Sequence, residues 1–152
     1  MTGQVQVQTG DFDVGEQYRA LLASGADSGG LALFIGRVRA DEGADPVVAL
    51  ELEHYPAMTE RSLQALVGQA QERWALDQVS VVHRVGRLSV GDQIVFVGVA
   101  AAHRREAFAA AQFLMDKLKT TAPFWKKEFR RSGASAWVEA KASDEAAASY
   151  WA

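Results

Sequence analysis

The sequence has 152 residues, of which 49% are hydrophobic and 23% charged, with a net charge of −3 and no cysteine. These values are typical of a globular chain, and they exclude a disulfide scaffold, a cysteine-ligated metal site and a cysteine nucleophile within the chain. The acidic balance disfavours a general nucleic-acid binder. The lack of a long apolar run or a signal-like start disfavours a membrane protein and favours the cytoplasm. We therefore expect a single domain over residues 1–152.

Apolar residues recur with the period of a strand or of a helix, between segments rich in Gly, Asp and Pro. Residues 94–99 are apolar on both faces, which predicts a central strand covered on both sides. Short turns between neighbouring strands favour antiparallel pairing, and hence an α+β fold over a doubly wound α/β fold. In chain order, we predict a helix at Val14–Ala23, strands at Leu31–Arg39 and Val47–Tyr55, a helix at Met58–Trp74, strands at Val79–Val85 and Gln93–Ala102, a helix at Arg104–Lys119, strands at Phe124–Arg131 and Ala136–Ala140, and a short helix capped by Ser143.

The charges are distributed unevenly along the chain. Residues 103–131 contain eight Lys and Arg and three acids, a net charge of +5, so the rest of the chain carries −8. Such a split predicts a local anion site on an otherwise acidic protein. Motifs for dinucleotides, P-loop phosphates, zinc proteases and serine hydrolases are absent, and His54, His83 and His103 lack the spacing of a metal motif. We therefore expect no metal site.

Two cationic pairs lie at the ends of predicted elements. Arg37 and Arg39 share one side of a strand, about 7 Å apart, which suits phosphate or carboxylate; alternatively, the strand end simply emerges into solvent. His103 and Arg104 begin the long helix, where unpaired backbone N–H groups also attract an anion. The alternative there is that His103 caps the helix while the arginines pair with acids such as Glu106.

Lys119 lies near the end of the same helix. It is about 40° around the helix axis from Met115, at the margin of the apolar face, whereas Lys117 is about 200° away. A lysine at such a margin can act as an acid, a base or a nucleophile. Alternatively, it extends its charge into solvent at the helix C-terminus, where cations are favoured.

The strand after this helix has two adjacent lysines. Alternation places Phe124, Lys126 and Glu128 on one side and Trp125 and Lys127 on the other. Basic residues interleaved with aromatic ones also occur where proteins stack nucleobases, but the acidic remainder of the chain favours one compact pocket. Together, these cations predict a pocket for a small, multiply anionic ligand.

Five segments are distinctive: FIGRVR at 34–39, LELEHYPAMTE at 50–60, HRVGRLSVGDQIVFVGVAAAHRREAF at 83–108, MDKLKTTAPFWKKE at 115–128 and WVEA at 137–140. In these segments the sequence resembles the large, catalytic subunit of molybdopterin synthase, and the resemblance covers nearly the whole chain. It implies an α/β hammerhead fold and a central homodimer. Each chain of that dimer binds one small, ubiquitin-like sulfur-carrier subunit, which gives a heterotetramer. No cofactor is implied.

The resemblance also implies a reaction. The carrier's C-terminal thiocarboxylate enters a pocket and provides sulfur for two transfers to cyclic pyranopterin monophosphate, forming the dithiolene of molybdopterin. A chain without cysteine cannot form a persulfide of its own, so sulfur has to arrive on another molecule. The alternatives are a noncatalytic module that binds an anionic nucleotide or pterin, and an interaction subunit whose basic patch docks an acidic partner.

The residues that the resemblance assigns coincide with the cations described above. Lys119 is expected beside the carrier's terminal carbonyl and Lys126 beside the substrate, while arginines and His103 hold the phosphate and the pterin oxygens. The expected catalytic residues are Lys119 and Lys126, and the expected substrate-binding residues are Arg37, Val38, Arg39, His103, Arg104, Lys119, Lys126, Lys127 and Glu128.

Overall fold

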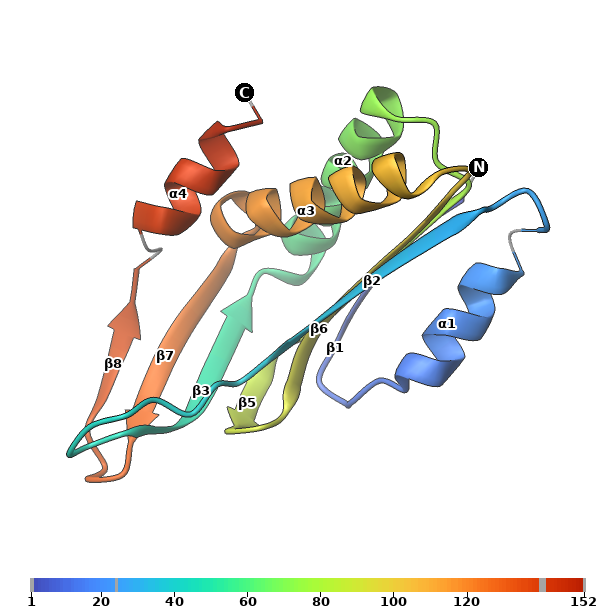
Figure 1. Ribbon diagram of the computed structural model, residues 1–152. Helices are drawn as coiled ribbons and strands as arrows, with labels where there is room; N and C mark the ends of the chain where they lie inside the picture. Colours follow the sequence, from blue (N-terminus) through green and yellow to red (C-terminus); the bar gives the residue numbers. More distant parts are fainter. Residues whose placement is uncertain (1, 24, 140–141, 152) are drawn as a thin grey trace.

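The structure is a computed structural model that describes residues 2–23, 25–139 and 142–151. Within these residues the chain forms four helices and eight strands, and the strands make two four-stranded sheets (Figure 1). Sheet A has the strand order β1-β4-β6-β2, and sheet B has the order β5-β3-β7-β8. The elements are β1 (Thr2–Gln8), α1 (Val14–Leu22), β2 (Gly30–Arg37), β3 (Val47–His54), α2 (Pro56–Arg73), β4 (Gln78–Arg84), β5 (Gly86–Ser89), β6 (Gln93–Ala101), α3 (Arg104–Thr121), β7 (Phe124–Arg130), β8 (Ser135–Val138) and α4 (Ala142–Ser149).

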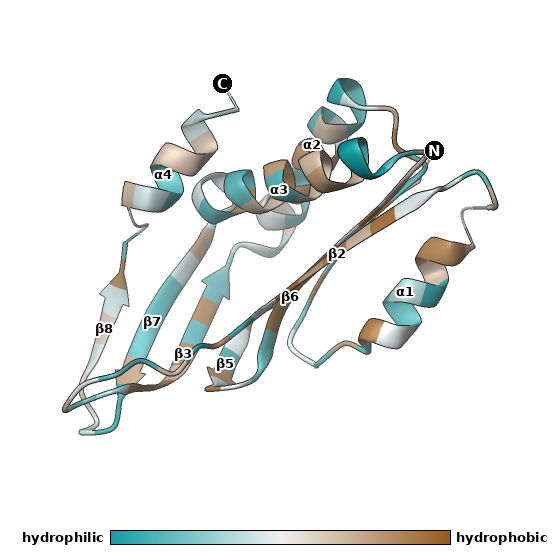
Figure 2. Cartoon of the chain, in the orientation of Figure 1, coloured by the Kyte–Doolittle hydropathy of each residue, from teal (hydrophilic) through white to brown (hydrophobic). Residues whose placement is uncertain are grey.

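Sheet A is covered on both faces, as predicted for residues 94–99. Its inner strand β6 directs Val95, Val97 and Val99 into a core formed with α2 and α3, and directs Phe96 toward α1 on the opposite face. In Figure 2, β6 is hydrophobic along much of its length, whereas β7 is largely hydrophilic. Because both faces of β6 are buried, sheet A provides the rigid part of the fold.

Helix α1 lies close against sheet A because of a glycine. The helix begins at Asp13, whose side chain accepts a hydrogen bond from the backbone N–H of Glu16 at 3.1 Å. Its residue Leu21 is buried against β6, and a Cβ atom at Gly98 would come within 2.6 Å of Leu21 Cδ1. Any larger residue at position 98 would therefore force the side chains of Leu21 and Phe96 to shift.

Sheet B is covered on its inner face only. There, Leu50, Leu52 and Leu88 are buried and form a small core. On the opposite face the side chains of Trp125 and Trp137 are exposed. Strands with one covered face alternate buried and exposed side chains, so β3 and β7 can present charged residues without breaking the fold.

The α+β class is confirmed, with differences in detail. The prediction missed β1, whose alternate glutamines hide the half-buried Val5 and Val7, and it missed the four-residue β5. β1 pairs parallel with β4, whereas the other strand pairs among the described residues are antiparallel. Strand β8 ends at Val138, and Ala140, the predicted end, lies outside the described residues. None of the described helices has the length and apolar character needed to cross a membrane.

Candidate active site

A pocket of about 670 Å³ lies between the two sheets and the C-terminal half of α3, and we call it the inter-sheet pocket. Apolar side chains from several elements form much of its wall, among them Ile35, Leu52 and Met115. Its charged lining residues are the cations Arg37, Arg39, Lys119, Lys126 and Arg130 and the acids Asp41, Glu128, Glu139 and Asp144. An apolar wall with converging cations suits a small anionic ligand that also has a ring system.

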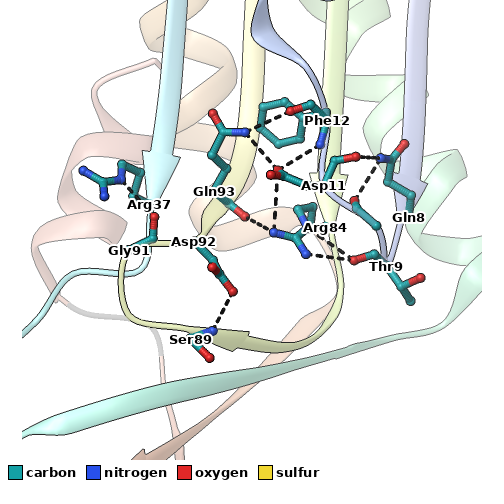
Figure 3. Close-up of polar contacts among 11 residues, drawn as sticks. Gln8, Thr9, Asp11, Phe12, Arg37, Arg84, Ser89, Gly91, Asp92 and Gln93 are labelled. Carbon is teal, nitrogen blue, oxygen red and sulfur yellow. Dashed lines mark hydrogen bonds and ion pairs between the residues drawn. The ribbon is translucent and has the colours of Figure 1, made fainter.

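Arg37 and Arg39 both line the inter-sheet pocket, but not as neighbours on a regular strand. A register shift between Gly36 and Arg37 interrupts the pairing with β6, and β2 ends at Arg37. The Arg37 Nε donates a hydrogen bond to the carbonyl of Gly91 at 3.1 Å (Figure 3). Between the arginines, the Val38 side chain is buried in the core of sheet B, so this residue has only its backbone to offer a ligand.

Lys119 and Lys126 approach the inter-sheet pocket from different elements. Lys119 lies near the end of α3 and is exposed, on the pocket side together with Met115 and Leu118. Lys126 lies on β7 opposite Leu52 of β3, on the inner face of sheet B. The structure thus brings together the two lysines that the sequence predicts as catalytic.

Lys127 lies on the other side of β7 from its neighbours. Glu128 lines the inter-sheet pocket with Lys126, whereas the Lys127 ammonium lies 5.5 Å from the ring centroids of both Phe129 and Trp137. This arrangement is the one that strand alternation predicts. Lys127 is therefore separated from the pocket by the strand itself, and the geometry gives it no direct route to a ligand there.

Arg130 is a pocket residue that the sequence reasoning left out. Its guanidinium lies 3.4 Å from a carboxylate oxygen of Glu128 and 3.4 Å from one of Asp41, and all three residues line the pocket. The alternation of side chains along β7 could have indicated it, since Arg130 follows Lys126 and Glu128 at alternate positions and therefore faces the same side of the strand.

His83 is a second pocket residue that was missed, having been considered only for a metal site. It lies near the end of β4 and is only 5% exposed. Burial lowers its pKa to about 4, with a smaller contribution from the positive charge of Lys119. His83 is therefore neutral near pH 7. Among the described residues, no three His, Asp or Glu side chains gather where they could hold a metal ion.

His103 and Arg104 line a different cavity, of about 470 Å³, at the start of α3, which we call the helix-start pocket. His103 occupies the N-cap position, but its side chain makes no capping hydrogen bond, which removes the capping alternative. The ion pairs found among the described residues do not include Arg104. Gly29 in the wall of this cavity lies very close to the backbone of Ala102, because a Cβ atom there would collide with the Ala102 carbonyl.

The two pockets lie at opposite ends of α3. Arg104 and Lys119 are fifteen residues apart on this helix, which places them about 22 Å apart along its axis. The site predicted as one cluster is therefore divided within a single chain. The inter-sheet pocket holds Arg37, Arg39, Lys119, Lys126 and Glu128, the helix-start pocket holds His103 and Arg104, and Val38 and Lys127 point elsewhere.

Comparisons with known proteins agree with this architecture. The family described as MoaE protein matches residues 7–121. The molybdopterin synthase catalytic subunit of Vibrio cholerae is 52% identical over 151 residues, 99% of each chain, and that of Escherichia coli is 52% identical over 140 residues, 92% of each chain. A solved MoaE protein of Burkholderia ambifaria has a TM-score of 0.83 and 47% identity, covering 99% of this chain and 98% of its own. The chain therefore belongs to the MoaE family, the family of the catalytic subunit of molybdopterin synthase.

Proposed function

We propose that this chain transfers sulfur from the thiocarboxylated C-terminus of a small, ubiquitin-like carrier subunit to cyclic pyranopterin monophosphate. Two transfers produce the dithiolene of molybdopterin. The observation that carries the proposal is the inter-sheet pocket, whose lining combines Arg37, Arg39, Lys119 and Lys126 with apolar side chains. The relatives that share about half of its residues are molybdopterin synthase catalytic subunits, which supports the same reaction.

The charged groups of the pocket suit distinct parts of this reaction. The guanidinium of Arg39 forms paired hydrogen bonds with phosphate oxygens, and Arg37 adds a second positive charge. The ammonium of Lys119 stabilises negative charge on the carrier's terminal carbonyl oxygen as the sulfur leaves, and Lys126 does the same for charge that develops on the substrate. The chain itself has no thiol, so the sulfur stays on the carrier until it is transferred. The absence of cysteine is also in keeping with the cytoplasm, our proposed location.

The divided site supports a homodimer. A small pterin phosphate cannot contact both Arg104 and Lys119 of one chain across about 22 Å. We infer that two copies associate so that His103 and Arg104 of one copy complete the inter-sheet pocket of the other. With one carrier bound to each copy, the assembly is a heterotetramer.

Reconstitution with the thiocarboxylated carrier and the cyclic pterin tests the reaction. The wild-type chain should form a dithiolene product, and Lys119→Ala should lower its rate about 100-fold or more, because an oriented cation at the reacting centre is lost. Lys117→Ala, on the other side of α3, is the matched control and should keep its activity. A folded, carrier-binding wild-type sample that forms no dithiolene would overturn the proposal and favour a noncatalytic pterin-binding module.

Mixing two inactive variants tests the shared site. If the site is shared, a dimer that combines an Arg104→Ala chain with a Lys119→Ala chain contains one intact site and one doubly altered site. Random mixing should then restore roughly a quarter of the wild-type activity. If both variants are inactive alone and the mixture is no more active, the site is not shared between copies.

A further inference from the structure

His83 is held firmly in the wall of the inter-sheet pocket. Its ring stacks on the ring of Phe124, with centroids 3.9 Å apart and an interplanar angle of 17°. Both residues line the pocket, and His83 is almost completely buried. A ring fixed in this way points its nitrogen atoms in set directions, which a surface histidine does not do.

The hydrogen bonding of His83 defines its tautomer. Its Nδ1 lies 2.7 Å from the backbone carbonyl oxygen of Arg84, and a carbonyl can only accept, so Nδ1 carries the proton. The neutral ring therefore has a lone pair at Nε2. The Arg84 side chain is itself anchored, by hydrogen bonds to the carbonyls of Thr9 and Gln93 and an ion pair with Asp11 (Figure 3). These contacts hold Arg84, whose carbonyl accepts the hydrogen bond from the Nδ1–H of His83.

His83 stays neutral in strongly charged surroundings. Burial is the main cause of its pKa of about 4, and the charges of Lys119 and His54 lower the pKa further, while the hydrogen bond to Arg84 raises it. The same pocket wall includes Lys126 and Glu128 from β7 and Asp144 from α4. Lys119 lines the same pocket from α3, so its side chain and the imidazole of His83 face one cavity.

We propose that His83 is a positioning residue for Lys119: when the lysine side chain turns into the inter-sheet pocket, in the free protein as well as during sulfur transfer, its ammonium donates a hydrogen bond to the Nε2 lone pair of His83. This inference rests on the proposed role of Lys119. A lysine has four rotatable bonds and loses much conformational freedom when it is ordered, so a prearranged acceptor increases the fraction of time that it points into the pocket. A carboxylate in this place would hold the lysine but neutralise it. A neutral imidazole holds it and preserves the positive charge that the reaction needs.

Kinetics of two His83 variants test the role. His83→Phe keeps an aromatic ring to stack on Phe124 but removes Nε2, and kcat should fall about tenfold, with KM for the pterin nearly unchanged. His83→Gln supplies an amide oxygen as acceptor and should recover part of this loss. His54→Phe, next to the same Phe124 ring but outside the pocket lining, is the matched control and should keep its kcat. A folded His83→Phe protein with normal kcat would overturn the proposal.

Nitrogen-15 NMR of His83 provides a test that needs no activity. Near pH 7 the spectrum should show a neutral ring protonated at Nδ1. Lys119→Met should shift the Nε2 signal and raise the pKa of His83 above about 4, since a nearby positive charge has been removed. Lys117→Met should change neither. An unchanged His83 spectrum in Lys119→Met would overturn the inference, whereas a wild-type chain that forms no dithiolene would overturn the proposed function alone.

Discussion

Sheet A and sheet B have the same number of strands, but they differ in what covers them. Helices cover both faces of sheet A, so its strand β6 is apolar from Ile94 to Ala101, whereas sheet B is covered on one face and no residue of its strand β7 is fully buried. The inter-sheet pocket forms where the ends of β2 and β4 meet the inner face of β3 and β7. Sheet A therefore provides rigidity, and sheet B provides charged side chains, since only a partly covered strand tolerates them.

The first prediction compares the loss of stability when one phenylalanine of each sheet is replaced by alanine. Phe96 in sheet A is fully buried, whereas Phe129 in sheet B is partly exposed and contacts the guanidinium of Arg87. Phe96→Ala should lower the free energy of unfolding by about 3–5 kcal/mol because it leaves a cavity in a close-packed core. Phe129→Ala should lower it by about 1 kcal/mol. Urea denaturation of both variants checks this, and equal losses would contradict the assignment of rigidity to sheet A.

The second prediction compares the rates of sulfur transfer when each of the adjacent lysines of β7 is replaced by alanine. Lys126→Ala should lower the rate of sulfur transfer about 100- to 1000-fold, equivalent to about 3–4 kcal/mol, because the inter-sheet pocket loses a positioned cation. Lys127→Ala should keep a rate close to wild type, because its ammonium faces Phe129 and Trp137 on the outer side. Single-turnover reconstitution measures both rates. If Lys127→Ala is as impaired as Lys126→Ala, the functional distinction between the two faces of sheet B is wrong.

The third effect is a pH dependence of stability from His83, at the junction of the two sheets. Its pKa is about 4 in the folded chain and 6.5 ordinarily, so between these values the unfolded chain binds more protons. Stability therefore falls as the pH falls from 6.5 to about 4, by up to about 3 kcal/mol from this group. His83→Phe should lack this contribution. Urea denaturation at about pH 7 and about pH 4.5 measures the difference, in which the carboxylates common to both proteins cancel; parallel pH profiles would contradict it.

Much of the fold could be predicted from local pattern. The doubly apolar run of β6 predicts its central position, and the end of α3 before Pro123 follows from the steric restriction that proline places on Ala122. β1 was missed because its alternate glutamines resemble a polar segment, and what stabilises it is pairing with β4, which lies seventy residues further along the chain. The residues of β1 alone cannot predict pairing with so distant a strand.

The site could be predicted in composition but not in arrangement. Lys119 and His103 were placed in one cluster because both flank apolar elements, but the length of α3 separates them. Lys127 was included because of the family resemblance, although the alternation of side chains along β7 already predicts that it points to the other face of the strand from Lys126. Arg130 pairs with Glu128 two residues away on its own strand, but its second partner, Asp41, comes from a distant loop that only the tertiary structure brings close.

The smallest expected effect concerns the ion pairs of Arg130, on the sheet B side of the pocket. Arg130 pairs with Glu128 and Asp41 at 3.4 Å, and the Arg130 and Asp41 side chains are 40% and 37% exposed. Arg130→Met should therefore lower the free energy of unfolding by no more than about 1 kcal/mol, and added salt should shrink the difference from wild type. The loss from Phe96→Ala should persist in salt, because apolar packing is not screened. Denaturation of both variants at low and high ionic strength distinguishes the two behaviours. A large, salt-independent loss in Arg130→Met would mean that sheet B depends on its charged residues for stability as well as for binding.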